Sequence, residues 1–152
     1  MTEPAALPRK TPCASCPYRR SVPSGVWHPD EYAKLERYDG DMAEQSSIAV
    51  FHCHQGSGDV CAGWLGHRDP ADLLAVRIGI MDGRLDRSCA EYTTDVMLFA
   101  SGAEAAAHGV REVYAPSSDA SDAIRKIVTT RAATGDPVTL DQPTGITSVE
   151  PA

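Results

Sequence analysis

Four cysteines of the 152-residue chain have the spacing of a metal site. Cys13 and Cys16 form a C-x-x-C pair, and Cys53 and Cys61 flank a glycine-rich loop farther along the chain. A C-x-x-C turn can point two thiolates at one ion, and four thiolates close a tetrahedral zinc site with bonds of about 2.3 Å. The spacing therefore predicts one structural metal held by Cys13, Cys16, Cys53 and Cys61.

The segment His52-Cys53-His54 leaves a choice of ligand. If this segment is a strand, alternate side chains point to opposite faces, so Cys53 faces away from both histidines. We expect Cys53 to be the ligand, and His54 to be a substitute ligand or a hydrogen-bond donor beside the site. His52 is expected to be packed or at the surface, and the fifth cysteine, Cys89, to be a small buried apolar residue.

The ligand types also bear on which metal binds. Zn²⁺ suits four sulfurs or three sulfurs and one nitrogen, whereas a [4Fe–4S] cluster takes four thiolates with irregular spacing. We expect zinc, with a [4Fe–4S] cluster in a redox-responsive regulator as the alternative. A thioredoxin-like redox pair fits less well, because the C-x-x-C lacks the strand–helix–strand context of that motif.

Two further histidines allow an enzymatic interpretation. Either His28 or His67 could act as a base or bind a catalytic zinc, with a nearby aspartate to orient it. The chain contains no G-x-S-x-G nucleophile motif and no H-E-x-x-H metal motif. We therefore expect a non-catalytic protein, and a metal-dependent enzyme that uses His28 and His67 is an alternative. The aspartates considered are Asp30, Asp59 and Asp69.

The first 26 residues are basic, with four cations and one acid, in a chain of net charge −7. Cations and an aromatic ring beside a C-x-x-C resemble the way small zinc modules contact single-stranded nucleic acid, so such binding through the Arg9–Arg20 segment is another alternative. The acidic remainder would repel phosphate, and aromatic and arginine anchors favour a protein partner instead. The residues expected to contact that partner are Arg9, Lys10, Tyr18, Arg19, Arg20 and Trp27.

The elements that must position the cysteines are short. Prolines and a lack of periodicity predict an extended loop over residues 1–28. Pro29 at the first helical position predicts a helix over 29–38. The apolar run 48–52 predicts a strand that leads into the glycine-rich loop. The predicted metal ligands therefore lie on loops and at a strand end.

Four more helices are predicted after the cysteine-rich part. Asp69 is a natural N-cap, and Pro70 suits the first position of the helix that follows. The Ser101-to-Glu104 capping box opens an alanine-rich helix. Apolar residues three or four apart predict the other two helices. The predicted spans are 70–80, 88–100, 101–113 and 118–133.

Leu, Ile, Val and Phe number only 27, so a large apolar core alone is not expected to hold the chain. We predict a small, mostly helical single α+β domain whose Cys-rich N-terminal half is organised around one structural metal. This domain covers residues 1–135, with a Cys/His-rich part at 11–80 and a helical part at 81–135, and a mobile tail follows at 136–152. No segment reaches the roughly 20 apolar residues of a membrane span, and the N-terminus lacks a signal-peptide core, so a cytoplasmic protein is expected.

Five sequence blocks carry a resemblance to a known family. They are Cys13-x-x-Cys16-Pro17-Tyr18-Arg19-Arg20, Val22-Pro23-Ser24-Gly25-Val26-Trp27, Tyr32-x-x-Leu35, Phe51-His52-Cys53-His54 and Cys61-Ala62-Gly63-Trp64. With these blocks the chain resembles a small uncharacterised family of actinobacteria and their bacteriophages, over roughly residues 11–80. The resemblance implies a Cys-rich metal-binding domain of phage or prophage origin and supplies no catalytic residues. We therefore expect a non-catalytic binding or regulatory module, a phage accessory protein that engages a host protein.

Overall fold

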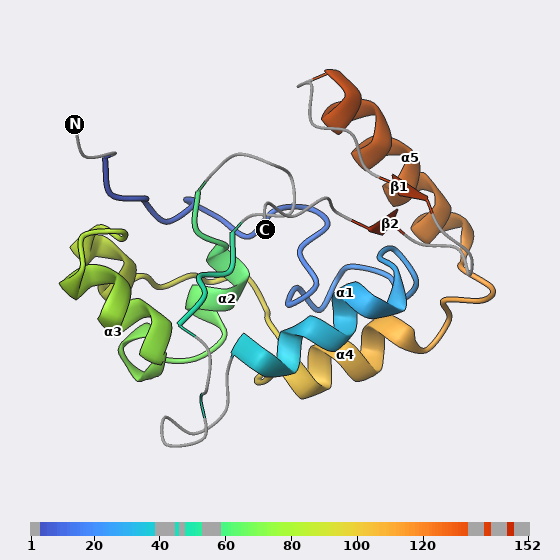
Figure 1. Cartoon of the computed structure of the whole chain (residues 1–152). Helices are drawn as coiled ribbons and strands as arrows, with labels where there is room; N and C mark the ends of the chain where they lie inside the picture. Colours follow the sequence, from blue (N-terminus) through green and yellow to red (C-terminus); the bar gives the residue numbers. More distant parts are fainter. Residues whose placement is uncertain are drawn as a thin grey trace.

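The computed structural model describes residues 4–38, 45, 48–52, 59–133, 139–140 and 146–147. Within these residues helices dominate and strands are few (Figure 1). The α-helices are α1 (Pro29–Ala33), α2 (Ala62–Gly66), α3 (Leu74–Met81), α4 (Gly102–Val110) and α5 (Ser118–Ala133). The 3₁₀-helices are η1 (Lys34–Tyr38), η3 (Pro70–Asp72) and η4 (Arg87–Glu91). The strands are β1 (Thr139–Leu140) and β2 (Ile146–Thr147).

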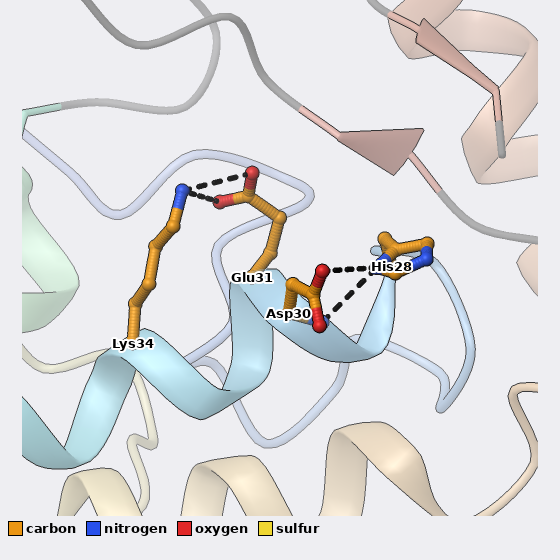
Figure 2. Close-up of polar contacts among 4 residues, drawn as sticks. All are labelled: His28, Asp30, Glu31 and Lys34. Atoms are coloured by element: carbon orange, nitrogen blue, oxygen red, sulfur yellow. Dashed lines mark hydrogen bonds and ion pairs between the residues drawn. The ribbon is translucent and has the colours of Figure 1, made fainter. Parts of the chain in front are cut away.

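The helix predicted over residues 29–38 is confirmed, with a change of pitch where α1 continues as η1. Pro29 lies at the start of the helix, where its missing N–H has no partner to lose. His28 is the N-cap, and its Nδ1 accepts a hydrogen bond from the amide of Asp30 at 3.1 Å (Figure 2). The Asp30 carboxylate also lies 3.6 Å from this Nδ1. The local sequence therefore begins the helix without help from distant residues.

The α1 helix packs against α4, and the two lie side by side in Figure 1. Gly109 of α4 faces the ring of Tyr32, and a Cβ at position 109 would overlap the ring carbons. The side chain of Glu31 in α1 is also buried. Both of its carboxylate oxygens accept hydrogen bonds from Lys34 Nζ, each at 3.2 Å (Figure 2). A buried charge needs such a partner.

The α4 helix begins with the capping residues that the sequence predicts. Ser101 Oγ accepts a hydrogen bond from the amide of Glu104 at 3.1 Å. The Glu104 carboxylate reaches back and accepts from the amide of Ala100 at 3.0 Å. The helix ends at Val110, a few residues before the predicted end.

The helix predicted over residues 70–80 begins later than expected. Asp69 caps as predicted, but the segment it caps is η3 rather than α3. Leu73 has an extended backbone, with φ −92° and ψ 116°, and α3 begins only at Leu74. The side-chain oxygen of Gln45 accepts a hydrogen bond from the amide of Leu74 at 2.7 Å. A residue far away in the sequence therefore stabilises the start of this helix, which local sequence alone cannot predict.

The prediction of a helix over residues 88–100 is wrong beyond Glu91. The η4 segment ends there, and Tyr92 has an extended backbone with φ −65° and ψ 133°. The residues that follow run beside the N-terminal segment, where the amide of Phe99 donates to the carbonyl of Tyr18 at 2.8 Å. This pairing satisfies backbone groups that a helix would have satisfied internally. The two threonines after Tyr92 also disfavour a helix, because they are β-branched.

The strand predicted over residues 48–52 is not formed among the residues that the structure describes there. His52 makes an isolated bridge with Val60 instead. The strands that are described, β1 and β2, pair antiparallel with Thr139 opposite Thr147. They lie within residues 136–152, for which the sequence predicts a mobile tail, and that mobility stays a prediction. The remainder of this tail lies outside the described residues.

The irregular N-terminal segment forms part of the core. As predicted, its described residues up to 28 form neither helix nor strand, yet Tyr18 and Trp27 are completely buried. Trp27 Nε1 donates a hydrogen bond to the carbonyl of Ser15 at 2.9 Å. The core is therefore built from a folded-in loop as much as from helices. The largest fully buried apolar side chains are Trp27, Trp64, Tyr18, Tyr32, Leu35, Leu65 and Leu73.

The α5 helix spans the residues predicted for it and lies at one end of the molecule in Figure 1. Its buried residues include Ala120 and Ile127. None of the described helices, α5 included, combines the length and apolar character needed to cross a membrane.

Candidate metal centre

The C-x-x-C pair forms a tight turn inside the N-terminal segment. The amide of Cys16 donates to the carbonyl of Cys13 at 3.1 Å, and the amide of Arg19 donates to the carbonyl of Cys16 at 3.0 Å. Both cysteines are buried, with 4% and 1% of their surface exposed. Two successive turns therefore hold both thiols on one short, enclosed loop, which we name the C-x-x-C turn.

Cys61 approaches this turn from a distant part of the sequence. It is the N-cap of α2, and its Sγ accepts a hydrogen bond from the amide of Trp64 at 3.4 Å. The Sγ atoms of Cys61 and Cys16 are 3.8 Å apart. Tertiary structure thus brings together two of the predicted ligands that are 45 residues apart in the sequence.

Cys13 is the third member of this group. Its Sγ lies 3.7 Å from the hydroxyl oxygen of Ser15, and its side chain is hydrogen-bonded to Cys16. Cys13, Cys16 and Cys61 are all reduced, with no disulfide between them. We call these three residues the three-cysteine cluster.

The spacing within the cluster can be compared with that of a zinc site. Two sulfurs bound to one tetrahedral zinc at 2.3 Å are about 3.8 Å apart. The distance between Cys16 Sγ and Cys61 Sγ matches this value. Among the residues that the structure describes, no group of three or more His, Cys, Asp or Glu side chains meets the geometry for holding a metal ion. Cys53 and His54 lie outside the described residues, so their predicted roles stay predictions.

The electrostatics of the cluster centre on Cys16. The hydrogen bond with Cys13 lowers the pKa of Cys16, but the contact with Cys61, burial and charge repulsion from Cys61 together outweigh it. The pKa of Cys16 therefore lies well above its usual value. An enclosed thiolate needs a compensating positive charge, which a bound cation would supply.

Two residues that support the cluster were missed by the sequence analysis. Gly63 lies so close to Cys16 that a Cβ at position 63 would overlap the sulfur. Ser15 contacts Cys13 through its hydroxyl and binds the indole of Trp27 through its carbonyl. A glycine inside a helix is a signal of close approach and could have identified Gly63. Ser15 carries no comparable signal.

The positions of His52 and Cys89 agree with the predictions made for them. His52 is exposed at the surface. Cys89 is fully buried, and its Sγ lies 3.7 Å from the carbonyl oxygen of Ala6. Burial is the main reason that the pKa of Cys89 rises to about 11. Cys89 is therefore a packed thiol apart from the three-cysteine cluster.

The prediction that Tyr18 and Trp27 contact a partner is wrong, because both residues are 0% exposed. The ring of Tyr18 stacks on the ring of His67, with the two centroids 4.6 Å apart. The N-terminal segment supplies these aromatic rings to the core because short helices cannot fill the interior by themselves.

The two histidines considered for catalysis both lie at helix ends. His28 caps the start of α1, as described above. His67 is the C-cap of α2, and its Nδ1 donates a hydrogen bond to the carbonyl of Trp64. Each ring therefore has a structural role that requires no catalysis.

The arginines of the basic segment bind backbone carbonyls. Arg19 Nη1 donates to the carbonyl of Pro12 at 3.0 Å, and Arg20 Nε donates to the carbonyl of Leu98 at 3.0 Å. Arg9 Nε donates to a carbonyl within its own loop. Part of the hydrogen-bonding capacity of these side chains is thus used inside the chain.

A groove of about 440 Å³ lies beside the C-x-x-C turn. The turn contributes Ala14 and Ser15 to its lining, and α5 contributes all the other lining residues. The α5 wall carries Asp119, Asp122 and Lys126. A ligand in this groove would touch the same loop that holds two of the thiols.

Comparison with known proteins identifies the family but no closer relative. No curated protein and no solved structure matches this chain. A model of DUF6283, a family of unknown function, matches residues 8–131. The matched range includes the whole of the three-cysteine cluster, helices α1 to α4 and most of α5. The chain belongs to the family of unknown function DUF6283.

Proposed function

We propose that this chain is a non-catalytic binding module whose N-terminal half is held together by one structural zinc ion. The observation that carries the proposal is the 3.8 Å separation of the Cys16 and Cys61 sulfurs, which is the ligand spacing of tetrahedral zinc. Cys13 and Cys53 complete the proposed ligand set, with His54 as the substitute for Cys53.

The way the N-terminal segment is folded supports a structural role for the metal. This segment is irregular, and turns and isolated β-bridges hold its backbone in place of a helix or an extended sheet. A metal that joins the C-x-x-C turn to α2 would add to these contacts, because structural zinc can contribute on the order of 10 kcal/mol to folding.

The contacts of the histidines support the non-catalytic part of the proposal. His28 and His67 are engaged at helix ends, where their rings stabilise the fold. A zinc with four protein ligands would also have no open position for substrate.

A protein partner is proposed in preference to nucleic acid. The net charge of −7 opposes phosphate, and three of the N-terminal arginines bind carbonyls of their own chain. The groove beside the C-x-x-C turn offers a mixed apolar and charged surface to such a partner. A reducing compartment such as the cytoplasm would keep the thiols free for the metal, and a phage accessory protein acting on a host protein there is the setting we infer from the family resemblance.

The decisive experiment is elemental analysis and visible absorption of the purified chain, with variants of single cysteines. We expect one zinc per chain, and loss of zinc in Cys13→Ser, Cys16→Ser and Cys61→Ser. Cys89→Ser is the matched control and should keep its zinc, because Cys89 lies apart from the cluster. Iron in the protein, together with a brown colour, would indicate an iron–sulfur cluster in place of zinc. A protein that contains no metal would overturn the proposal.

The choice of partner class needs a separate measurement. Single-stranded DNA and RNA should bind weakly at physiological salt, with Kd values far above the micromolar range. Sub-micromolar, salt-sensitive binding that is lost in a variant lacking Arg9, Lys10, Arg19 and Arg20 would overturn the preference for a protein.

A further inference from the structure

Two thiols that lie far apart in the sequence are also placed for a different reaction. Cys16 Sγ and Cys61 Sγ are 3.8 Å apart, and a disulfide requires about 2.05 Å. We propose that oxidation of the metal-free protein joins Cys16 to Cys61 in a disulfide, so that the cluster is an oxidative modification site. The proposal uses the sulfurs of the proposed zinc site but does not depend on zinc binding.

The surroundings of the two sulfurs favour this pair. The backbone of Gly63 lies against Cys16 Sγ and leaves no room for movement in that direction. The amide of Trp64 holds Cys61 Sγ at the start of α2. The sulfurs therefore need to approach each other by less than about 2 Å. Cys13, which contacts both Ser15 and Cys16, lies on the same short turn as Cys16.

The resulting bond would also be more stabilising than one within the C-x-x-C turn. A Cys16–Cys61 disulfide closes a loop between residues 45 positions apart, and the entropy removed from the unfolded chain grows with loop length. A Cys13–Cys16 bond would close a loop of only a few residues. A Cys13–Cys16 bond would also not connect the turn to α2.

Hydrogen peroxide is the oxidant we name, because both cysteines are buried and only a small molecule can reach them. One sulfur attacks a peroxide oxygen, the O–O bond breaks, and a sulfenic acid and one water form. The second sulfur attacks the sulfenic sulfur and expels a second water as the S–S bond forms. Two thiols lose two electrons and two protons, and one peroxide is reduced to two waters.

Oxidation would therefore exchange one link between the C-x-x-C turn and α2, the proposed metal, for another, the disulfide. In the reduced cluster all three sulfurs can serve as metal ligands, whereas the disulfide removes two of the ligands proposed for zinc. Oxidised protein should therefore take up no zinc until a thiol reductant restores both sulfurs.

Peptide mapping can test the pairing directly. Metal-free protein is treated with one equivalent of peroxide, the remaining thiols are alkylated, and the chain is digested. Cys13 and Cys16 share one tryptic peptide, because no Lys or Arg lies between them, so a bond between them stays within that peptide. A bond from Cys16 to Cys61 links two peptides, and cleavage before Asp59 separates Cys61 from Cys53.

We expect the linked peptides in the wild type, in Cys13→Ser and in the control Cys89→Ser, and their loss in Cys16→Ser and Cys61→Ser. A bond within the C-x-x-C peptide, a bond to Cys53, or the absence of any disulfide would overturn the inference. If the linked peptides form in a chain that binds no zinc, the disulfide stands and the proposed zinc site fails. If zinc binds and the metal-free chain forms no such bond, the zinc site stands and the disulfide fails.

Discussion

The backbone of Gly63, at the second position of α2, lies directly against the sulfur of Cys16. Any side chain at residue 63 would overlap that sulfur and push α2 away from the C-x-x-C turn. Gly63→Ala should therefore lower the free energy of unfolding by about 1–3 kcal/mol, as overpacking of a core does. It should also weaken zinc binding, because Cys61 at the start of α2 moves with the helix. Urea unfolding and competition with a coloured chelator would measure both effects.

Gly109→Ala is the matched control for this substitution. It creates the same kind of overlap, but with the ring of Tyr32 at the contact between α1 and α4. The variant should lose comparable stability and keep one zinc per chain. Equal zinc affinity in wild type and Gly63→Ala would show that the close approach to Cys16 is irrelevant to the metal.

Removal of the metal should destabilise the N-terminal half of the molecule, which then unfolds at a lower temperature. The buried loop that carries Cys13 and Cys16 has little regular structure of its own, and a structural zinc contributes on the order of 10 kcal/mol. A chelator should therefore lower the Tm sharply, as followed by circular dichroism with metal loss checked by elemental analysis. An unchanged Tm in demonstrably zinc-free protein contradicts the structural role.

Loss of the cap of α4 should have a smaller and local effect. Ser101→Ala removes the acceptor for the amide of Glu104 and should lower the free energy of unfolding by about 1 kcal/mol. Ser101→Asp should retain most of the stability, because a carboxylate can accept the same hydrogen bond and suits a helix N-terminus. Chemical denaturation of the three proteins tests the prediction, and equal stability of the alanine and aspartate variants would refute the capping role.

Alkaline pH should destabilise the fold through Tyr32. Burial is the main reason that the pKa of Tyr32 rises to about 12, and its hydroxyl accepts a hydrogen bond from the amide of Trp27 at 3.1 Å. The unfolded chain releases the Tyr proton near pH 10, so the folded state loses stability as pH rises from about 10 to 12. This loss amounts to roughly 2–3 kcal/mol, because each pKa unit corresponds to about 1.4 kcal/mol.

Comparison with Tyr32→Phe isolates this contribution. The phenylalanine variant should be less stable at neutral pH, because the amide of Trp27 loses its acceptor. Its free energy of unfolding should fall less steeply than that of the wild type between pH 10 and 12. Parallel pH profiles for the two proteins would exclude Tyr32 as the source of the alkaline loss.

Several local features follow from the sequence alone because neighbouring residues determine them. Pro29 and its flanking residues begin α1, and Ser101 with Glu104 begins α4, through contacts within a few positions. The span of α5 also agrees with its apolar periodicity. The same local reasoning fails after Glu91, where backbone groups that could have formed a helix bond instead to the N-terminal segment.

The sequence by itself determined which residues were candidates for the metal, since cysteines in a C-x-x-C pair and a second cluster are a chemical signature. Only the tertiary structure decided that Cys16 and Cys61 meet at 3.8 Å, with the backbone of Gly63 against the sulfur. The tertiary structure also buries Tyr18 and Trp27 in the core, although both were expected at the surface. The physical reason is that burial and long-range contact depend on how the irregular loop folds back against α2, and no local pattern of residues encodes that path.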